Sequence, residues 1–197
     1  MSRVATAYLL TCAAIGVATG LLIIPATALS TALYPTAPPL SALTYAAWVV
    51  GYVLAMRLLE RPGAALLTGL ISGLVATPLS ATGPAIIITN VMFAAIVELP
   101  FLLTLYRRWS AWLLYGGSVA GAALYSAWTV LAADMAAFPA WVLVAYVVAT
   151  LVSAAVGAWL GILIADRLRR AGVAKLARRR GLAARGLGAG AGPAGQH

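Results

Sequence analysis

Apolar runs long enough to cross a lipid bilayer recur along almost the whole of this 197-residue chain. Each run has about 18 residues or more, which matches a hydrocarbon core of roughly 30 Å when the run is helical. Lipid offers backbone groups no water to bond with, so such a segment must be a helix or a strand of a closed barrel. The runs are too long for barrel strands and lack the alternation that barrels need, so we predict helices.

Composition supports a membrane protein over a soluble domain. Only 9% of the residues are charged, whereas 63% are hydrophobic. A water-soluble domain of this length needs many more surface charges, so the fold class we predict is an all-α integral membrane protein. The formal net charge of +9 is a feature shared with nucleic-acid-binding proteins. The basic residues lie at the ends of apolar runs and in the tail, however, so we expect no nucleic acid as a partner.

Proline, glycine and charged residues divide the chain into six predicted transmembrane helices, at about residues 4–24, 40–59, 63–80, 84–106, 110–133 and 139–165. A cleaved signal peptide is the alternative for the first run, since Ala26 and Ala28 form a small-x-small pattern. Residues 1–170 form the predicted six-helix domain. Residues 171–197 are basic and rich in glycine and alanine, so we predict a disordered cytoplasmic tail that touches anionic lipid. Docking of RNA or of a protein is the alternative for this tail.

All 13 lysine and arginine residues fall on one side of this topology. They precede the first predicted helix, lie between the second and third, follow the fourth and cluster after the sixth. The connections 25–39, 81–83 and 134–138 hold none. The positive-inside rule therefore places both termini in the cytoplasm. The location we predict is the plasma membrane, crossed several times, with membrane lipid as a partner.

One carboxylate lies deep within an apolar run. Glu60, Asp134 and Asp166 lie at the ends of predicted helices, but Glu98 lies about 14 residues into its span, or roughly 20 Å along the helix axis. A charge at that depth costs at least ~2.5 kcal/mol, so Glu98 should face the bundle interior. It is either a ligand-binding group or a hydrogen-bonded link between helices. Asn90 precedes it by eight residues, about 80° around the helix, and can line the same cavity.

Aromatic residues form a second feature. Tyr45, Trp48 and Tyr52 share one face of the second predicted helix, and Tyr125 and Trp128 form a pair in the fifth. By the predicted topology, both groups lie in the outer half of the membrane. An aromatic wall beside a buried carboxylate suits a cationic or aminopyrimidine-like ligand, held by ring stacking and a charge-assisted hydrogen bond. The alternative is an interfacial aromatic belt, which we prefer for two further residues, Tyr34 and Trp141.

Small residues recur at four-residue spacing in several of the predicted helices. The first helix carries Gly16 and Gly20, and the sixth carries Ser153, Gly157 and Gly161. Small side chains at this spacing let helix backbones approach closely. The stripes serve either packing within the chain or contact with a partner membrane protein.

The sequence lacks the residues that several kinds of functional site need. Cys12 is the only cysteine and His197 the only histidine, so we expect no disulfide and no protein-held metal. The chain contains no G-x-x-x-x-G-K-[ST] loop and no serine and histidine pairing, so we predict neither an ATPase nor a hydrolase. We therefore expect no enzyme activity and no cofactor. A ligand-free scaffold subunit is the rival to a ligand-binding protein.

Several segments, taken in order, carry a family resemblance: YAAW at 45–48, RPGAAL at 61–66, GP at 83–84 ahead of Glu98, LY at 105–106, GGSVAGAALYSAW at 116–128 and VSAAVGAWLGILIADRL at 152–168. They resemble the substrate-binding S-components of energy-coupling factor (ECF) vitamin transporters of the YkoE type. The resemblance covers most of residues 40–170. It rests on the order and spacing of the segments together with the six-helix topology.

The resemblance implies a six-helix bundle that captures thiamin, or its hydroxymethylpyrimidine precursor, at the outer face. Such a subunit works with a transmembrane T-component and cytoplasmic ATPase subunits, and its small-residue faces contact the T-component. The substrate-binding residues expected on this basis are Tyr45, Trp48, Asn90, Glu98, Tyr125 and Trp128. The expected partner interface comprises Gly16, Gly20, Ser153, Gly157 and Gly161. Phe93 stands where the family has a glutamine and Asn90 where it has a glycine, which leaves a different vitamin-like substrate as an alternative.

Overall fold

The computed structural model describes residues 3–80, 83–107, 109–132, 135 and 138–171. Within these ranges the chain forms helices joined by turns, with no strand, which confirms the all-helical prediction for the described part. The predicted tail lies outside the described residues from residue 172 onward, and so does Asp134.

The helices coincide with the six predicted segments. Their bounds are α1 Arg3–Leu33, α2 Pro38–Ala42, the 3-10 turn η1 Leu43–Tyr45, α3 Ala46–Leu59, α4 Ala64–Ala76, the 3-10 turn η2 Thr77–Leu79, α5 Ala85–Leu103, α6 Ala111–Ala132 and α7 Ala140–Arg170. The first helix is longer than predicted, because it continues through Pro25 instead of ending there. Prolines are tolerated inside membrane helices when neighbouring groups satisfy the freed carbonyl. The last helix likewise continues to Arg170.

Four of the helical segments are long and apolar enough to cross a membrane: Thr6–Leu33, Pro38–Leu59, Ala85–Leu103 and Ala140–Arg170. The segment Ala64–Leu79 is apolar but shorter than a full span. The remaining long helix, α6, has 22 residues, but its glycines, tyrosines and tryptophans lower its hydropathy. That α4 and α6 also cross the membrane, which would give six spans with both termini in the cytoplasm, therefore stays a prediction.

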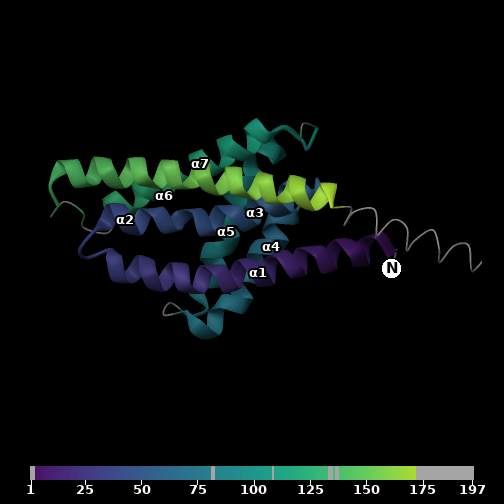
Figure 1. Ribbon diagram of the computed structural model, residues 1–197, viewed down its shortest axis with the longest axis horizontal. Helices are drawn as coiled ribbons and strands as arrows, with labels where there is room; N and C mark the ends of the chain where they lie inside the picture. Colours follow the sequence, from purple (N-terminus) through teal and green to yellow (C-terminus); the bar gives the residue numbers. More distant parts are fainter. Residues whose placement is uncertain (1–2, 81–82, 108, 133–134, 136–137, 172–197) are drawn as a thin grey trace, which may run out of the picture.

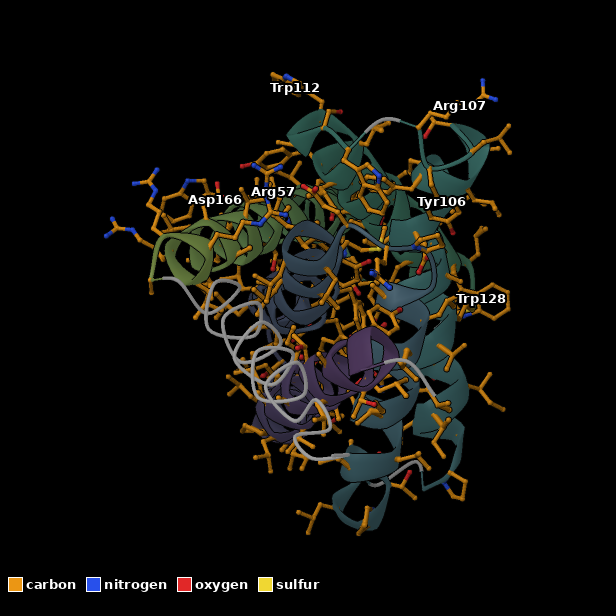
Figure 2. The ribbon with its side chains drawn as sticks, turned by 90° about the vertical axis from the view of Figure 1, so that its right-hand side faces the viewer. Arg57, Tyr106, Arg107, Trp112, Trp128 and Asp166 are labelled. Carbon is orange, nitrogen blue, oxygen red and sulfur yellow. The ribbon has the colours of Figure 1, made fainter. Side chains whose placement is uncertain are left out.

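The helices form two rows. α1, α2 with α3, and α7 run side by side along the long axis of the molecule, while α4, α5 and α6 form a second row beside them (Figures 1 and 2). The start of α1 and the end of α7 lie at the same end of the long axis (Figure 1). The core lies between the rows and is built from residues of η1, α3, α4, α5, α6 and α7, including Tyr52, Val53, Phe101 and Ala154.

Glycines set the closest helix contacts. A Cβ atom on Gly157 would lie 2.9 Å from the Ala46 carbonyl oxygen, and one on Gly161 would lie 2.8 Å from that of Val50, so α7 lies against α3 backbone to backbone. In the same way Gly16 and Gly20 bring α1 against α4, where added Cβ atoms would lie 2.7 Å from the Ile71 side chain and 2.8 Å from the Ser72 carbonyl oxygen. Packing within the chain thus accounts for these glycines, and their contact with a partner protein stays a prediction.

Ser153 also lies within the bundle. Its hydroxyl donates to the Leu43 carbonyl oxygen at 2.7 Å and accepts from the Ala46 backbone N–H at 2.8 Å. Leu43 begins the 3-10 turn η1 and Ala46 directly follows it, and the regular helical hydrogen-bond pattern changes in this turn. Ser153 therefore fixes, from α7, the turn that carries Tyr45.

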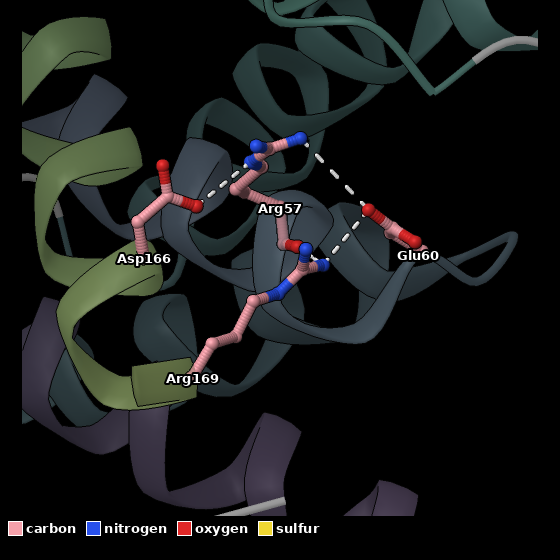
Figure 3. A network of polar contacts seen from close by, with 4 residues as sticks. All are labelled: Arg57, Glu60, Asp166 and Arg169. Atoms are coloured by element: carbon pink, nitrogen blue, oxygen red, sulfur yellow. Dashed lines mark hydrogen bonds and ion pairs between the residues drawn. The ribbon is translucent and has the colours of Figure 1, made fainter. Parts of the chain in front are cut away.

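Charged residues gather at the end where α1 begins and α7 ends. The Arg57 Nε atom on α3 lies 3.2 Å from Asp166 Oδ1 on α7, and Arg169 Nη2 lies 2.8 Å from Glu60 Oε1 (Figure 3). Arg169 also donates to the Arg57 carbonyl oxygen. The four side chains are partly exposed, so each pair is worth at most about 1 kcal/mol. Figure 2 views the molecule from this end, which the positive-inside rule assigns to the cytoplasm.

Candidate functional site

A small aromatic cavity lies at the opposite end of the bundle from the charged network. Its accessible volume is about 20 Å³, which is room for about one water molecule. Four aromatic side chains line it: Tyr45 from η1, Trp48 from α3, Tyr125 from α6 and Tyr146 from α7. The hydroxyl residues Ser30, Ser41 and Thr44 complete its polar lining. Three of the predicted substrate-binding residues are thus brought together by three separate helical segments.

The aromatic rings of this site are locked against one another. Tyr45 and Tyr125 stack with their ring centroids 5.3 Å apart and their planes at 28°. Phe93 on α5 meets both rings edge-on, with centroids 5.7 Å from Tyr45 and 5.3 Å from Tyr125. Each such pair contributes roughly 0.5–1.5 kcal/mol of stability in addition to the contribution from the apolar area that it buries. The three rings therefore brace one another, and Phe93, where the resembled family has a glutamine, packs against Tyr45 and Tyr125 without lining the cavity.

Trp48 presents an unpaired donor at this cavity. Its indole Nε1 atom is buried and has no hydrogen-bond partner among the described residues. Buried donors are nearly always paired, because an unpaired one costs about 1–3 kcal/mol. The tyrosine and serine oxygens around the cavity do not reach this nitrogen. The Trp48 indole N–H is therefore one of the few buried side-chain groups without a partner among the described residues.

Asn90 is fully buried among α3, α4 and α5 and does not line the cavity. Its amide oxygen accepts hydrogen bonds from the Tyr52 hydroxyl and, at 3.3 Å, from the Ser72 hydroxyl. Its amide nitrogen donates to the Ile86 carbonyl oxygen at 2.8 Å. The side chain is thus satisfied within the protein, and a contact between Asn90 and substrate stays a prediction.

Glu98 is buried, with 2% of its surface exposed, and lies against the start of α4. Its carboxylate accepts hydrogen bonds from the backbone N–H of Gly63, from that of Leu66 at 3.2 Å and from the Tyr106 hydroxyl at 2.8 Å. Gly63 is the N-cap of α4 and has no side chain to cap the helix. The first N–H groups of a helix lack internal partners and carry partial positive charge. From α5, Glu98 supplies the acceptors for these N–H groups and a carboxylate that complements their partial positive charge.

Tyr106, which follows the end of α5, completes this carboxylate site. Burial, followed by the neighbouring Glu98, raises the pKa of Tyr106 to about 12, so its hydroxyl stays a donor at neutral pH. The residue has a positive φ of 55°. This left-handed turn points the ring back toward the bundle. Of the two alternatives that the sequence left for Glu98, the hydrogen-bonded link between helices has direct support, and a contact with substrate stays a prediction.

Trp128 points away from the cavity. It is 71% exposed and projects from the outer surface of α6 (Figure 2). At membrane depth this surface faces lipid. Tyr125, one turn earlier, turns its ring inward. A substrate contact by Trp128 therefore lacks support from the geometry and stays untested.

Tyr146 is the lining residue that sequence reasoning missed. A signal was present, because Tyr125 lies seven residues before the end of α6 and Tyr146 six residues after the start of α7. Two helices joined at one end of a bundle place such residues at the same depth. Ser30 and Ser41 carried no comparable signal, since isolated serines are common in membrane helices.

No group of three or more histidine, cysteine, aspartate or glutamate residues gathers anywhere in the described part of the chain. The described lining of the aromatic cavity consists of aromatic, hydroxyl and alanine side chains and contains no charged one. The lining therefore offers aromatic faces and hydroxyl groups, and no charged side chain.

Two comparisons with known proteins agree with a membrane transport subunit. Residues 8–124 match a family model described as the permease component of an ABC-type cobalt transport system. The chain belongs to this family. Its fold is similar to that of a solved structure described as an S-component of an ECF transporter, with a TM-score of 0.75 and 23% sequence identity, over 90% of this chain and 95% of that one. No curated protein matches the sequence.

The family and the four apolar helices together define the location. The chain is a multi-pass protein of the plasma membrane. Its fold is that of an S-component, since the similarity extends over nearly the whole of both chains.

Proposed function

We propose that this protein is the substrate-binding S-component of an ECF-type transporter, capturing thiamin or hydroxymethylpyrimidine at the outer face for ATP-driven uptake. The observation that carries the proposal is the aromatic cavity, which joins Tyr45, Trp48 and Tyr125 inside a fold similar to that of an S-component. The cavity lies at the end of the bundle that the positive-inside rule assigns to the exterior. A substrate taken up from outside must be met at that end.

The rival role, a ligand-free scaffold, predicts that Trp48 and its neighbours are packed with no space between them. The unpaired indole N–H of Trp48 favours a ligand. The accessible volume of about 20 Å³ holds about one water molecule, so a ligand must widen the cavity when it binds. An aromatic wall is typical of sites for flat rings, which stack on it.

The family description names cobalt, and we propose an organic substrate instead. A transition-metal ion requires imidazole, thiolate or carboxylate ligands. The described residues bring no three such groups together, and the described lining of the cavity carries no charge. Co²⁺ added to the purified protein should therefore leave its tryptophan fluorescence unchanged.

A T-component and ATPase subunits complete the transporter in this proposal. The chain has no phosphate-binding loop of its own, so the energy for uptake must come from partner subunits. The exposed apolar stripe of α7, formed by residues such as Val144, Val148 and Val152, offers a face for a membrane partner or for lipid.

The proposal is tested by titrating the detergent-purified full chain with thiamin and, separately, with hydroxymethylpyrimidine while tryptophan fluorescence is recorded. Saturable quenching by one of them supports the proposal and selects the substrate. The signal should be lost in Trp48→Leu and kept in Trp159→Leu, because Trp159 is exposed on α7 away from the cavity. Absence of any response, from protein shown by mass spectrometry to carry no bound ligand, contradicts it.

A further inference from the structure

We infer that the connection between α5 and α6 carries a binding surface for anionic phospholipid of the cytoplasmic leaflet. This surface, called here the α5–α6 surface, is formed by Leu103, Leu105, Arg107 and Trp112. Arg107 pairs with a lipid phosphate, and the three apolar side chains contact the upper part of the acyl chains. The inference uses the predicted orientation of the chain and does not depend on which substrate the protein binds.

The first observation is that large apolar side chains are exposed where α5 ends and α6 begins. Leu103 is 76% exposed, Leu105 67% and Trp112 83%. Figure 2, which views the molecule from the end assigned to the cytoplasm, shows Trp112 and Arg107 projecting outward from its rim. A tryptophan and an arginine beside leucines are typical of the membrane–water boundary, because each has an apolar body and a polar tip. These side chains therefore point into surrounding lipid at headgroup level.

The second observation is that the connection is held in a fixed conformation from inside the bundle. Leu105 and Tyr106 have positive φ angles of 51° and 55°, a left-handed conformation that residues other than glycine rarely adopt. Such a conformation persists where the surroundings impose it. The Tyr106 hydroxyl donates to Glu98 at 2.8 Å, and the Trp109 ring packs against Tyr106 and Phe101, with centroids 5.9 and 5.2 Å away. These contacts hold Tyr106 inward, and its neighbour Leu105 is left outward.

The third observation concerns charge. Arg107 is exposed and forms no ion pair with the described residues. A second exposed arginine, Arg61, lies in the turn between α3 and α4, where its guanidinium lies 5.8 Å from the centre of the Tyr8 ring. The two connections meet at Glu98, whose carboxylate accepts hydrogen bonds from Gly63 of one and from the tyrosine that precedes Arg107 in the other. Two positive charges thus belong to neighbouring connections at this end.

The acidic residue beside Arg61 does not cancel this charge. Glu60 Oε1 lies 2.8 Å from Arg169 Nη2 and 3.9 Å from Arg57 Nη1, so two other arginines already neutralise it. The phosphate of an anionic lipid is the complement that this end lacks. A phospholipid would engage Arg107 and the apolar side chains together, whereas a soluble phosphate would engage only the guanidinium. Phospholipid therefore fits the α5–α6 surface better.

The experiment places a fluorescent reporter in the connection. Ser110→Cys in a Cys12→Ala background is labelled with bimane, since Ser110 is exposed and is not part of the α5–α6 surface. The full chain is reconstituted in phosphatidylcholine vesicles with a minor fraction of nitroxide-labelled phosphatidylglycerol or, separately, of nitroxide-labelled phosphatidylcholine. Stronger quenching by phosphatidylglycerol measures its enrichment at the connection. Arg107→Gln and Trp112→Ala alter the surface, and Arg170→Gln, which removes an exposed arginine at the end of α7, is the matched control.

The inference predicts that phosphatidylglycerol is enriched over phosphatidylcholine in the labelled parent. Arg107→Gln should reduce this enrichment about fivefold, the factor that corresponds to about 1 kcal/mol for one basic residue at an anionic surface. Arg170→Gln removes the same net charge and should leave the enrichment unchanged. Trp112→Ala should lower quenching by both lipids alike, because it removes an apolar contact and no charge.

Three results would overturn the inference. Equal quenching by the two lipids in the parent would show that the connection does not select anionic lipid, and would leave its exposed side chains to a protein partner. Loss of the enrichment on adding soluble glycerol phosphate would show a site for soluble phosphate. An equal fall in Arg107→Gln and Arg170→Gln would assign the effect to net charge alone. The substrate titration is independent of all three results.

Discussion

At the scale of single residues, the buried carboxylate is explained by its neighbours in the protein. Glu98 accepts hydrogen bonds from two backbone N–H groups at the start of α4 and from Tyr106. The partner helix α4 cannot be read from the apolar pattern around Glu98, because the donors are backbone groups 35 and 32 residues away. The sequence alone indicated that this residue needs a partner, and only the structure identifies it.

Replacing Glu98 with glutamine should lower the free energy of unfolding by about 2 kcal/mol, because an amide cannot accept at both of its terminal atoms and loses the negative charge at the helix start. Unfolding in mixed micelles measures this. Glu60→Gln, which alters only the partly exposed ion pairs with Arg57 and Arg169, should change stability by less than about 1 kcal/mol. Substrate affinity should be unchanged in Glu98→Gln. An unchanged stability with lost affinity would instead make Glu98 a substrate ligand.

At the scale of helices, their number and positions were predictable and their pairing was not. Hydropathy located all six segments, since length and apolar composition are local properties. Which helix packs on which depends on small residues, and Gly157 signals a close contact without naming α3 as its partner. The continuation of α1 through Pro25 also went unpredicted, because proline marks a helix end in water more reliably than in lipid.

The contact between α7 and α3 should depend on the absence of side chains. Gly157→Ala places a Cβ about 2.9 Å from the Ala46 carbonyl oxygen, so the helices must separate. Overpacking of this kind costs about 1–3 kcal/mol, measurable as a lower unfolding free energy in mixed micelles. Gly116→Ala on α6, where an added Cβ meets nothing within 4 Å, is the control and should be neutral or stabilising. Equal effects at the two positions would contradict the close-packing account.

At the scale of the whole molecule, the two ends of the bundle are chemically distinct. One end carries the ion pairs of Arg57 and Arg169, and the other carries the aromatic cavity. The predicted orientation of the chain in the membrane rests on this difference through the positive-inside rule. Tyr45 and Trp48 were predictable because they share a helix face, and Tyr125 because it belongs to the aromatic pair of the fifth predicted helix. Tyr146 joins them through tertiary folding, so no local pattern predicted it.

The predicted orientation can be measured with single cysteines in a Cys12→Ala background. Thr36→Cys, in the turn between α1 and α2, should react with a membrane-impermeant maleimide in intact cells. Gln196→Cys, in the predicted cytoplasmic tail, should react only after the cells are opened. The reverse pattern would place the aromatic cavity on the cytoplasmic side and would remove the basis for uptake from outside.

The most direct test of the central claim, that the aromatic cavity is the substrate site, is equilibrium binding of radiolabelled hydroxymethylpyrimidine to two variants of α6. Tyr125 lines the cavity, whereas Trp128, one turn further along, is exposed to lipid. Tyr125→Ala should weaken binding at least about tenfold, since it removes a stacked wall of the site. Trp128→Ala should bind like the wild-type chain. Lost binding in Trp128→Ala with full binding in Tyr125→Ala would contradict the claim.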